Sequence, residues 1–215
     1  MFPKLKSLFM LDSDIVYLNH GSYGSTPKPI FDSLIKWQKT LEYNPTKHLG
    51  FDLLNYLEKS RIALSSYVHC NKDDIVFFPN PSTALNTVIK SLDLKPDDEI
   101  LSTNHEYGAL DKTWNYISKK TGIKYIQTPI PLPLTSKKEF IDTILKNITK
   151  NTKIIFLSHI TSSTGLIFPI EEICKIAKEN NIISIIDGAH VPGHIDLNIA
   201  NLDPDVYTGA CHKWM

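Results

Sequence analysis

The stretch "IISIIDGAHVPGHIDLNIANLDPDVYTGACHKWM", residues 182–215, decides the fold. It opens with an apolar, β-branched run at 182–186, which predicts a fully buried strand. Asp187 stands where this strand ends, and a second short strand is predicted at 206–208. Lys213 follows that second strand. The stretch therefore places a carboxylate and a lysine behind two successive strands.

A carboxylate at one strand end and an isolated lysine after the next strand suit the cofactor pyridoxal 5'-phosphate. In such a site Lys213 forms a Schiff base with the cofactor aldehyde. Asp187 keeps the pyridine nitrogen protonated, so that the ring can accept electrons. A carboxylate that closes an apolar run needs a partner, because an unpaired buried charge is costly, and a pyridinium N–H is such a partner.

Working outward, the chain alternates strands and helices from residue 73 onward. The predicted strands are 75–78, 99–102, 124–127, 153–158, 182–186 and 206–208. The predicted helices of this part are 83–92, 109–121, 137–147 and 170–180, and two amphipathic helices, 30–41 and 52–68, precede it. This alternation predicts an α/β fold with a doubly wound, mostly parallel sheet. Such sheets bind ligands outside the carboxyl ends of their strands.

Further candidate residues also follow predicted strands. In "NPSTALN", residues 80–86, Ser82 and Thr83 lie at a helix N-terminus, where free N–H groups and the helix dipole bind phosphate; alternatively, Ser82 simply caps the helix. His105 follows the strand at 99–102 and is a candidate catalytic residue, or a loop histidine. A metal site at the i, i+4 pair His190 and His194 competes with the cofactor site, but Pro192 and Gly193 disfavour a continuous helix there, so we expect no metal.

Composition narrows the class of protein. Twenty-three basic and twenty-three acidic residues cancel, so we expect neither a nucleic-acid partner nor a membrane partner. The hydrophobic content of 42% is ordinary for a globular protein, and no apolar run is long enough to span a membrane. The three cysteines fit a reducing compartment better than a disulfide framework. We therefore expect a cytoplasmic protein.

Five ordered motifs carry a resemblance to a known family. They are "YLNHGSYGSTP" at 17–27, "NPSTALN" at 80–86, "HEYGALDKTW" at 105–114, "SHITSSTG" at 158–165 and "DGAHVPG…YTGACHKW" at 187–214. Together they resemble the class V aminotransferase family of pyridoxal phosphate enzymes of fold type I, and most closely its isopenicillin N epimerase-like branch. The family also includes cysteine desulfurases.

The resemblance implies roles for particular residues. It implies that His105 stacks on the pyridine ring and that His190 faces the phenolic oxygen of the cofactor. His212 is grouped with the cofactor-binding residues, and Asn19, His20 and Tyr23 with the substrate. The implied function is an epimerase-like reaction on an amino acid through an aldimine and a carbanion, in a homodimer. A C–S lyase acting on cysteine or another sulfur compound is the alternative within the family.

The resemblance also implies that part of the family pattern is absent. Members of the family continue beyond the lysine into a last strand and a small C-terminal domain, so a truncated non-catalytic relative or half of a split protein is an alternative of another class. Ala210 and Ser162 depart from the family pattern, the first at a phosphate contact and the second where desulfurases usually have Asn. We expect residues 1–50 to form an extended segment and helix that contribute to the site, and residues 51–215 to form the cofactor-binding domain.

Overall fold

The computed structural model describes residues 5–215, which form two compact units. The first unit comprises the chain up to Ile75 together with Cys211–Met215, and the second unit comprises Val76–Ala210. The division predicted at residue 50 concerns contributions to a site and stays a prediction.

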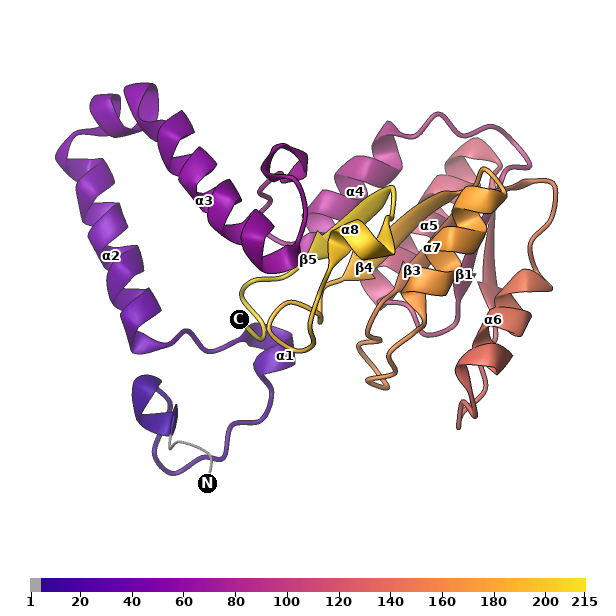
Figure 1. Ribbon diagram of the computed structural model, residues 1–215, viewed down its shortest axis with the longest axis horizontal. Helices are drawn as coiled ribbons and strands as arrows, with labels where there is room; N and C mark the ends of the chain where they lie inside the picture. Colours follow the sequence, from indigo (N-terminus) through magenta and orange to yellow (C-terminus); the bar gives the residue numbers. More distant parts are fainter. Residues whose placement is uncertain (1–4) are drawn as a thin grey trace. The chain divides into compact units, whose positions relative to one another are not determined.

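The second unit is built around one five-stranded sheet (Figure 1). Its strands are β1 (Glu99–Thr103), β2 (Lys124–Thr128), β3 (Thr152–Ser158), β4 (Ile183–Gly188) and β5 (Val206–Gly209). Their order is β2-β1-β3-β4-β5, and every pairing is parallel. The central strands β3 and β4 are almost continuously buried, as expected for strands covered on both faces.

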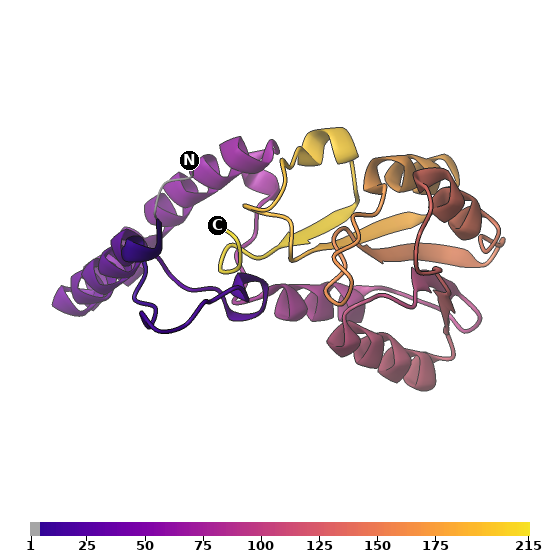
Figure 2. The ribbon, with the colours of Figure 1, turned by 90° about the horizontal axis from the view of Figure 1, so that it is seen from below.

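Helices cover both faces of this sheet, as Figure 2 shows. The helices of the second unit are α4 (Pro81–Ser91), α5 (Gly108–Thr121), α6 (Lys137–Leu145), α7 (Ile170–Glu179) and the short α8 (Ile199–Leu202). Helices α4 and α5 share one core with the sheet, in which Leu85 and Trp114 are fully buried. Helices α6 and α7 share the other core, which includes Phe140 and Ile173. The predicted doubly wound α/β fold is confirmed.

The strand order reverses between β1 and β3. The chain passes from β1 outward to β2 and then returns across β1 to form β3, so the helices α5 and α6 leave toward opposite faces. In an open parallel sheet, such a reversal leaves a crevice at the carboxyl ends of the two strands, and ligands bind there. This topology directs attention to the turns that follow β1 and β3.

The first unit consists of helices and extended segments. Its elements are η1 (Leu5–Leu8), α1 (His20–Tyr23), α2 (Lys28–Tyr43), the π-type turn η2 (Thr46–Phe51), α3 (Leu53–Val68) and η3 (Lys72–Asp74). Helix α2 ends before Pro45, which cannot continue it. Within residues 5–215, no helix is both long enough and apolar enough to cross a membrane.

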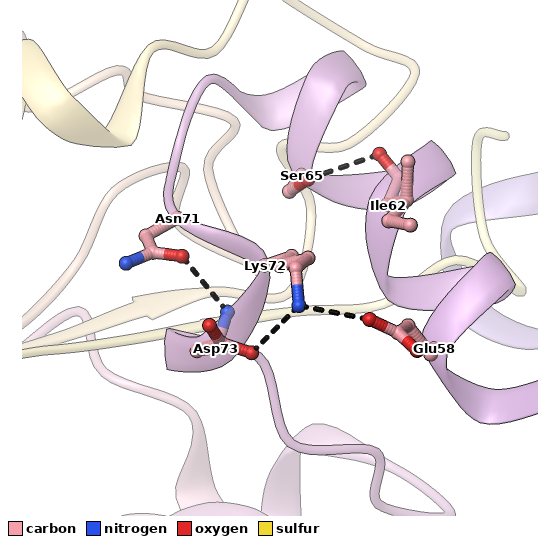
Figure 3. A network of polar contacts seen from close by, with 6 residues as sticks. All are labelled: Glu58, Ile62, Ser65, Asn71, Lys72 and Asp73. Atoms are coloured by element: carbon pink, nitrogen blue, oxygen red, sulfur yellow. Dashed lines mark hydrogen bonds and ion pairs between the residues drawn. The ribbon is translucent and has the colours of Figure 1, made fainter. Parts of the chain in front are cut away.

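A polar network fixes the turn after α3 (Figure 3). The Lys72 ammonium donates to Glu58 Oε1 of α3 at 3.0 Å and to Asp73 Oδ1 at 3.1 Å. Asn71 caps η3 by accepting the Asp73 N–H at 3.0 Å. The hydrogen bond to Glu58 is the main cause of the raised pKa of Lys72. The ammonium therefore remains charged and holds η3 against α3.

The predicted elements are confirmed to within a few residues, apart from the strand at 75–78. There the described chain runs without strand pairing, so that prediction is wrong. Val76, Phe77 and Phe78 are exposed by 73%, 46% and 41%. A β-propensity run becomes a strand only when a neighbour accepts its backbone hydrogen bonds, and β5 pairs only with β4 among the described strands.

Candidate functional site

The carboxyl edge of the sheet gathers polar side chains from adjacent strands. In the parallel register, Ser158 of β3 pairs with Asp187 of β4, and Asp187 pairs with Thr208 of β5. The three residues therefore stand side by side across the sheet. All three side chains are buried. The turn after β1 adds His105 and Glu106, which are also buried. The polar residues that follow β1 and end β3, β4 and β5 therefore lie at one edge of the sheet.

Asp187 lies at the centre of this edge and is only 4% exposed. Its Oδ1 accepts the Ala189 N–H at 3.0 Å and the Thr208 hydroxyl at 3.4 Å. Its backbone carbonyl accepts the His159 N–H at 2.9 Å, which ties β4 to the loop after β3. A buried carboxylate fixed by short-range hydrogen bonds has one orientation, as a ligand-binding group requires.

Gly188 allows β4 and β5 to lie close together beside Asp187. A Cβ at this position would lie 2.3 Å from the ring of Tyr207. The Tyr207 hydroxyl lies 2.9 Å from Nδ1 of His159. Burial lowers the pKa of His159 to about 4 and raises the pKa of Tyr207, so both rings are neutral at neutral pH. The hydrogen bond between these two neutral side chains joins β5 to the residue that follows β3.

Glu106 is a buried acid at the crevice between β1 and β3. Its Oε2 accepts both the N–H and the hydroxyl of Ser158 at 2.7 Å, and its Oε1 lies 2.6 Å from the Thr103 hydroxyl. Burial raises the pKa of Glu106 to about 7, and the charge of Asp187 contributes to the increase. The sequence analysis missed this residue. The available signal was its place directly after a strand end, but sequence does not reveal its burial.

His105 is placed at the predicted edge, but its ring contacts protein on several sides. Nε2 lies 3.1 Å from the Ile130 carbonyl and Nδ1 lies 3.4 Å from the Thr164 hydroxyl. The ring also packs edge-on against Phe168. Because a carbonyl only accepts, Nε2 carries the proton and Nδ1 accepts from Thr164. Stacking of His105 on a cofactor stays a prediction.

The N-terminus of α4 is capped by Asn80 rather than by Ser82. Asn80 Oδ1 accepts the Thr83 N–H at 2.8 Å and lies 3.1 Å from the Thr83 hydroxyl. The alternative that Ser82 serves as the N-cap is therefore wrong. Ser82 and Thr83 line an open hollow of about 310 Å³ along α4, and Lys90 lies at the same hollow. Phosphate binding by Ser82 and Thr83 stays a prediction.

His190 follows Asp187 in the turn after β4. It is half-buried, and its carbonyl accepts from Nδ1 of His194 at 3.2 Å. The pair is therefore joined through a backbone carbonyl. Among the described residues, no three His, Cys, Asp or Glu side chains gather closely enough to hold a metal ion.

Lys213 and His212 belong to the first unit, with the predicted substrate residues Asn19, His20 and Tyr23. Two glycines show how tightly these segments pack. A Cβ at Gly21 would lie 2.6 Å from the Trp214 ring, and a Cβ at Gly24 would lie 2.1 Å from the His212 carbonyl oxygen.

Gly24 also has φ +66°, which favours glycine. The lysine-bearing turn and the segment at 19–24 are therefore neighbours within this unit. His20 packs edge-on against Phe9 and Tyr17, whereas Tyr23 is 86% exposed.

Comparisons with known proteins extend these observations. Residues 16–215 match the family model described as aminotransferase class-V. The chain is 31% identical over 208 residues to isopenicillin N epimerase of Amycolatopsis lactamdurans, covering 95% of this chain and 52% of that protein. It is 28% identical to hercynylcysteine sulfoxide lyase of Schizosaccharomyces pombe, covering 99% of this chain and 54% of that protein.

Solved structures show the same fold. A cystine C–S lyase in complex with cysteine persulfide superposes with a TM-score of 0.85 at 24% identity, covering 94% of this chain and 54% of that one. An apo cysteine desulfurase from Thermococcus onnurineus superposes with a TM-score of 0.82 at 25% identity, covering 97% and 52%. The chain spans about half the length of the curated relatives it matches. By its family model, its relatives and its fold, this chain belongs to the class-V aminotransferase family.

Proposed function

We propose that the chain binds pyridoxal 5'-phosphate and serves an enzyme that acts on an amino acid. The observation that carries this proposal is Asp187, a buried carboxylate held in one orientation at the carboxyl edge of a parallel sheet. The donor set suits the cofactor, because a fixed carboxylate is the partner that a protonated ring nitrogen needs. When bound, the cofactor withdraws electrons from the amino acid that it holds.

The roles of the residues follow from their chemistry. Asp187 holds the proton of the ring nitrogen, and Lys213 supplies the amine that reacts with the cofactor aldehyde and then moves a proton. Ser82 and Thr83, at the start of α4, bind the phosphate with hydroxyl and backbone donors. His105 and His190 border the ring, with His212 beside the lysine. Asn19, His20 and Tyr23 contact the substrate, which is supported by their proximity to the lysine-bearing turn within the first unit.

Titration of the purified chain with pyridoxal phosphate tests the proposal. The wild type is expected to develop a visible absorbance band and to retain the cofactor on a desalting column. Lys213→Ala is expected to lose that band, whereas the matched control Lys175→Ala, on the exposed face of α7, retains it. Asp187→Asn is expected to retain the band but to change its pH dependence. Identical spectra for wild type and Lys213→Ala contradict the assignment of Lys213.

Two reactions are candidates, because both isopenicillin N epimerases and a sulfoxide lyase are among the relatives that match the chain. We propose epimerisation first, since two isopenicillin N epimerases match the chain at 31% and 29% identity. The second candidate is C–S cleavage, supported by the sulfoxide lyase relative. Incubation with a panel of L-amino acids, cysteine among them, separates the two. Loss of optical activity supports epimerisation, sulfide and pyruvate release supports cleavage, and amino-group transfer contradicts both.

We also propose a homodimer in the cytoplasm. Ile30, Leu34 and Trp37 form an exposed apolar stripe along α2, which supports burial against a second copy. The cysteines Cys70, Cys174 and Cys211 are free thiols, which supports a reducing compartment. Sedimentation equilibrium is expected to give a dimer for the wild type and a weaker dimer for Leu34→Glu, and cell fractionation tests the location.

A further inference from the structure

Glu106 is a buried titratable group that the proposed function does not use. It lies in the turn after β1, at the reversal of strand order, and is 8% exposed. Its three hydrogen-bond partners are the Ser158 N–H, the Ser158 hydroxyl and the Thr103 hydroxyl. Among residues 5–215, no ion pair involves Glu106. A buried carboxylate without a cation is costly, so the neutral acid is favoured here.

A second buried carboxyl lies on the other side of Ser158. Ser158 of β3 pairs in register with Asp187 of β4, so the serine that binds Glu106 is the direct neighbour of Asp187. Adjacent strands are separated by roughly 4.8 Å. The charge of Asp187 also acts on Glu106 and raises its pKa, after burial, because each carboxylate disfavours ionisation of the other. One proton is therefore expected to remain on this pair near neutral pH.

The hydrogen bonds indicate which member keeps the proton. Both donors of Ser158 point to Oε2 of Glu106, so that oxygen acts only as an acceptor. Oε1 lies 2.6 Å from Thr103 Oγ1, a hydroxyl oxygen that can accept as well as donate. A proton on Oε1 therefore has an acceptor. Both carboxyls accept a backbone N–H, but burial raises the pKa of Glu106 to about 7, which favours Glu106 as the protonated member.

We propose that Glu106 is a positioning residue that holds the proton of the Glu106–Asp187 pair, so that Asp187 is the ionised member. As a neutral acid, Glu106 also fastens the end of β3 to the turn after β1 through Ser158. The inference rests on the proposed function, because it concerns the charge that Asp187 offers to a protonated ring nitrogen. It adds a residue that acts through Asp187 and contacts neither cofactor nor substrate.

The other titratable groups around Glu106 do not supply a compensating cation. Tyr125 of β2 has a raised pKa, caused first by burial, with the charge of Glu106 among the smaller causes. His105, on the same turn, directs Nε2 to the Ile130 carbonyl and Nδ1 to Thr164. Asp187 is the one acidic neighbour that raises the pKa of Glu106, after burial. The raised pKa of Glu106 is therefore due first to burial and then to the charge of Asp187.

The first test measures the proton directly, without cofactor. The full chain is labelled with 13C at the glutamate side-chain carboxyl, and the Glu106 resonance is assigned by its loss in Glu106→Gln. We expect a titration midpoint near 7 in the wild type and a clear fall of the midpoint in Asp187→Asn. The matched control Asp196→Asn removes an exposed carboxylate and leaves the midpoint in place. A Glu106 midpoint that is unmoved by Asp187→Asn, or that lies in the usual glutamate range, overturns the proposal.

The second test measures cofactor affinity. Gln at position 106 reproduces the shape of the neutral acid, with its carbonyl toward Ser158, whereas Ala removes every hydrogen bond. We expect Glu106→Ala to bind pyridoxal phosphate about tenfold more weakly than Glu106→Gln, the equivalent of one lost hydrogen bond between neutral groups. The control pair Glu99→Ala and Glu99→Gln, at the opposite end of β1, is expected to differ less than twofold.

Equal weakening by Gln and Ala at position 106 overturns the proposal, because it means that the carboxylate and not the neutral acid is required. Wild-type protein that fails to bind the cofactor contradicts the proposed function instead. The carboxyl titration then still decides whether Glu106 and Asp187 share a proton.

Discussion

The two ends of the sheet contain the same hydrogen-bonded unit in different surroundings. At the amino end of β4, Asp205 Oδ2 accepts the N–H and the hydroxyl of Ser184 at 2.8 and 2.9 Å. At the carboxyl end of β3, Glu106 Oε2 accepts the N–H and the hydroxyl of Ser158 at 2.7 Å. Asp205 is exposed, whereas Glu106 is enclosed beside a second carboxyl.

Hydrogen bonds alone therefore do not determine the charge of a buried carboxyl. Hydrogen bonds from Ser158 and Thr103 lower the pKa of Glu106, yet burial outweighs them and raises it to about 7. At the exposed end, water supplies the stabilisation that burial removes. The amino end is therefore suited to joining strands, and the carboxyl end to holding a proton.

The largest difference in stability is expected when the carboxyls of Glu106 and Asp205 are removed one at a time. Glu106→Ala leaves the two donors of Ser158 without their acceptor and the hydroxyl of Thr103 without its partner, at a buried position. We expect a loss of about 3 kcal/mol in the free energy of unfolding, against about 1 kcal/mol for Asp205→Ala. Urea denaturation of both variants at pH 7 measures this difference. Equal losses would show that enclosure does not distinguish the two ends.

The second prediction concerns pH. The raised pKa of Glu106 means that the folded state keeps a proton that the unfolded state releases, so its contribution to stability falls as pH rises from about 4.5 to about 7. The lowered pKa of His159 acts in the opposite direction, since its contribution is lost as pH falls from 6.5 to about 4. In the wild type the two changes in the free energy of unfolding therefore offset each other between about pH 4.5 and 6.5.

Glu106→Gln removes the pH-dependent contribution of Glu106 to stability and leaves that of His159. We expect this variant to lose about 3 kcal/mol of stability between pH 6.5 and pH 4 relative to the wild-type profile. Asp205→Asn serves as the control, and its profile is expected to follow the wild type in this range. Urea midpoints measured at half-unit pH intervals provide the comparison. A Glu106→Gln profile parallel to the wild type would contradict the assigned proton.

A smaller loss of stability is expected when a side chain is added at the carboxyl end of β4. In Gly188→Ala the new methyl group meets the ring of Tyr207, 2.3 Å away in the present packing. Such overpacking costs about 1–3 kcal/mol. Gly108→Ala is the matched control, because a Cβ there has nothing within 4 Å. Thermal denaturation measures both, and a Gly188→Ala variant as stable as the control would show that the strand ends separate easily.

The smallest effect is expected at the helix caps. Asn80 caps α4 and Ser136 caps α6, each by accepting the N–H of the residue three positions later. Replacing either by Ala is expected to cost about 1 kcal/mol in unfolding free energy. Only Asn80→Ala is expected also to weaken pyridoxal phosphate binding, because α4 is the proposed phosphate helix. Equal cofactor affinities in the two variants would remove α4 from the site.

The sequence predicted those features that depend on local pattern. The buried run before Asp187 and the alternating helices and strands gave the sheet, because apolar periodicity reports burial on one or both faces. The strand at 75–78 failed because pairing is a property of two segments, and no described strand pairs with this one. Asn80, rather than Ser82, caps α4 because cap geometry depends on where the helix begins, which sequence locates only within a few residues.

The site was predictable in its residue types but not in its charge states. Asp187 could be identified from its place after an apolar strand, and it lies at the predicted edge. Glu106 could not be singled out, because its raised pKa depends on burial and on Asp187, which is far from it in sequence. Likewise, the contact between His159 and Tyr207 joins residues of different strands and has no local signature.

The packing of Gly24 against the carbonyl of His212 bears on how the chain acquires its structure during synthesis. The segment at 19–24 is synthesised long before Trp214 and His212, the residues against which its glycines pack. Contacts between such distant segments form late and slow folding, because a long loop must close first. The contacts between the segment at 19–24 and the turn that carries Lys213 therefore form only after the strands of the second unit have been synthesised.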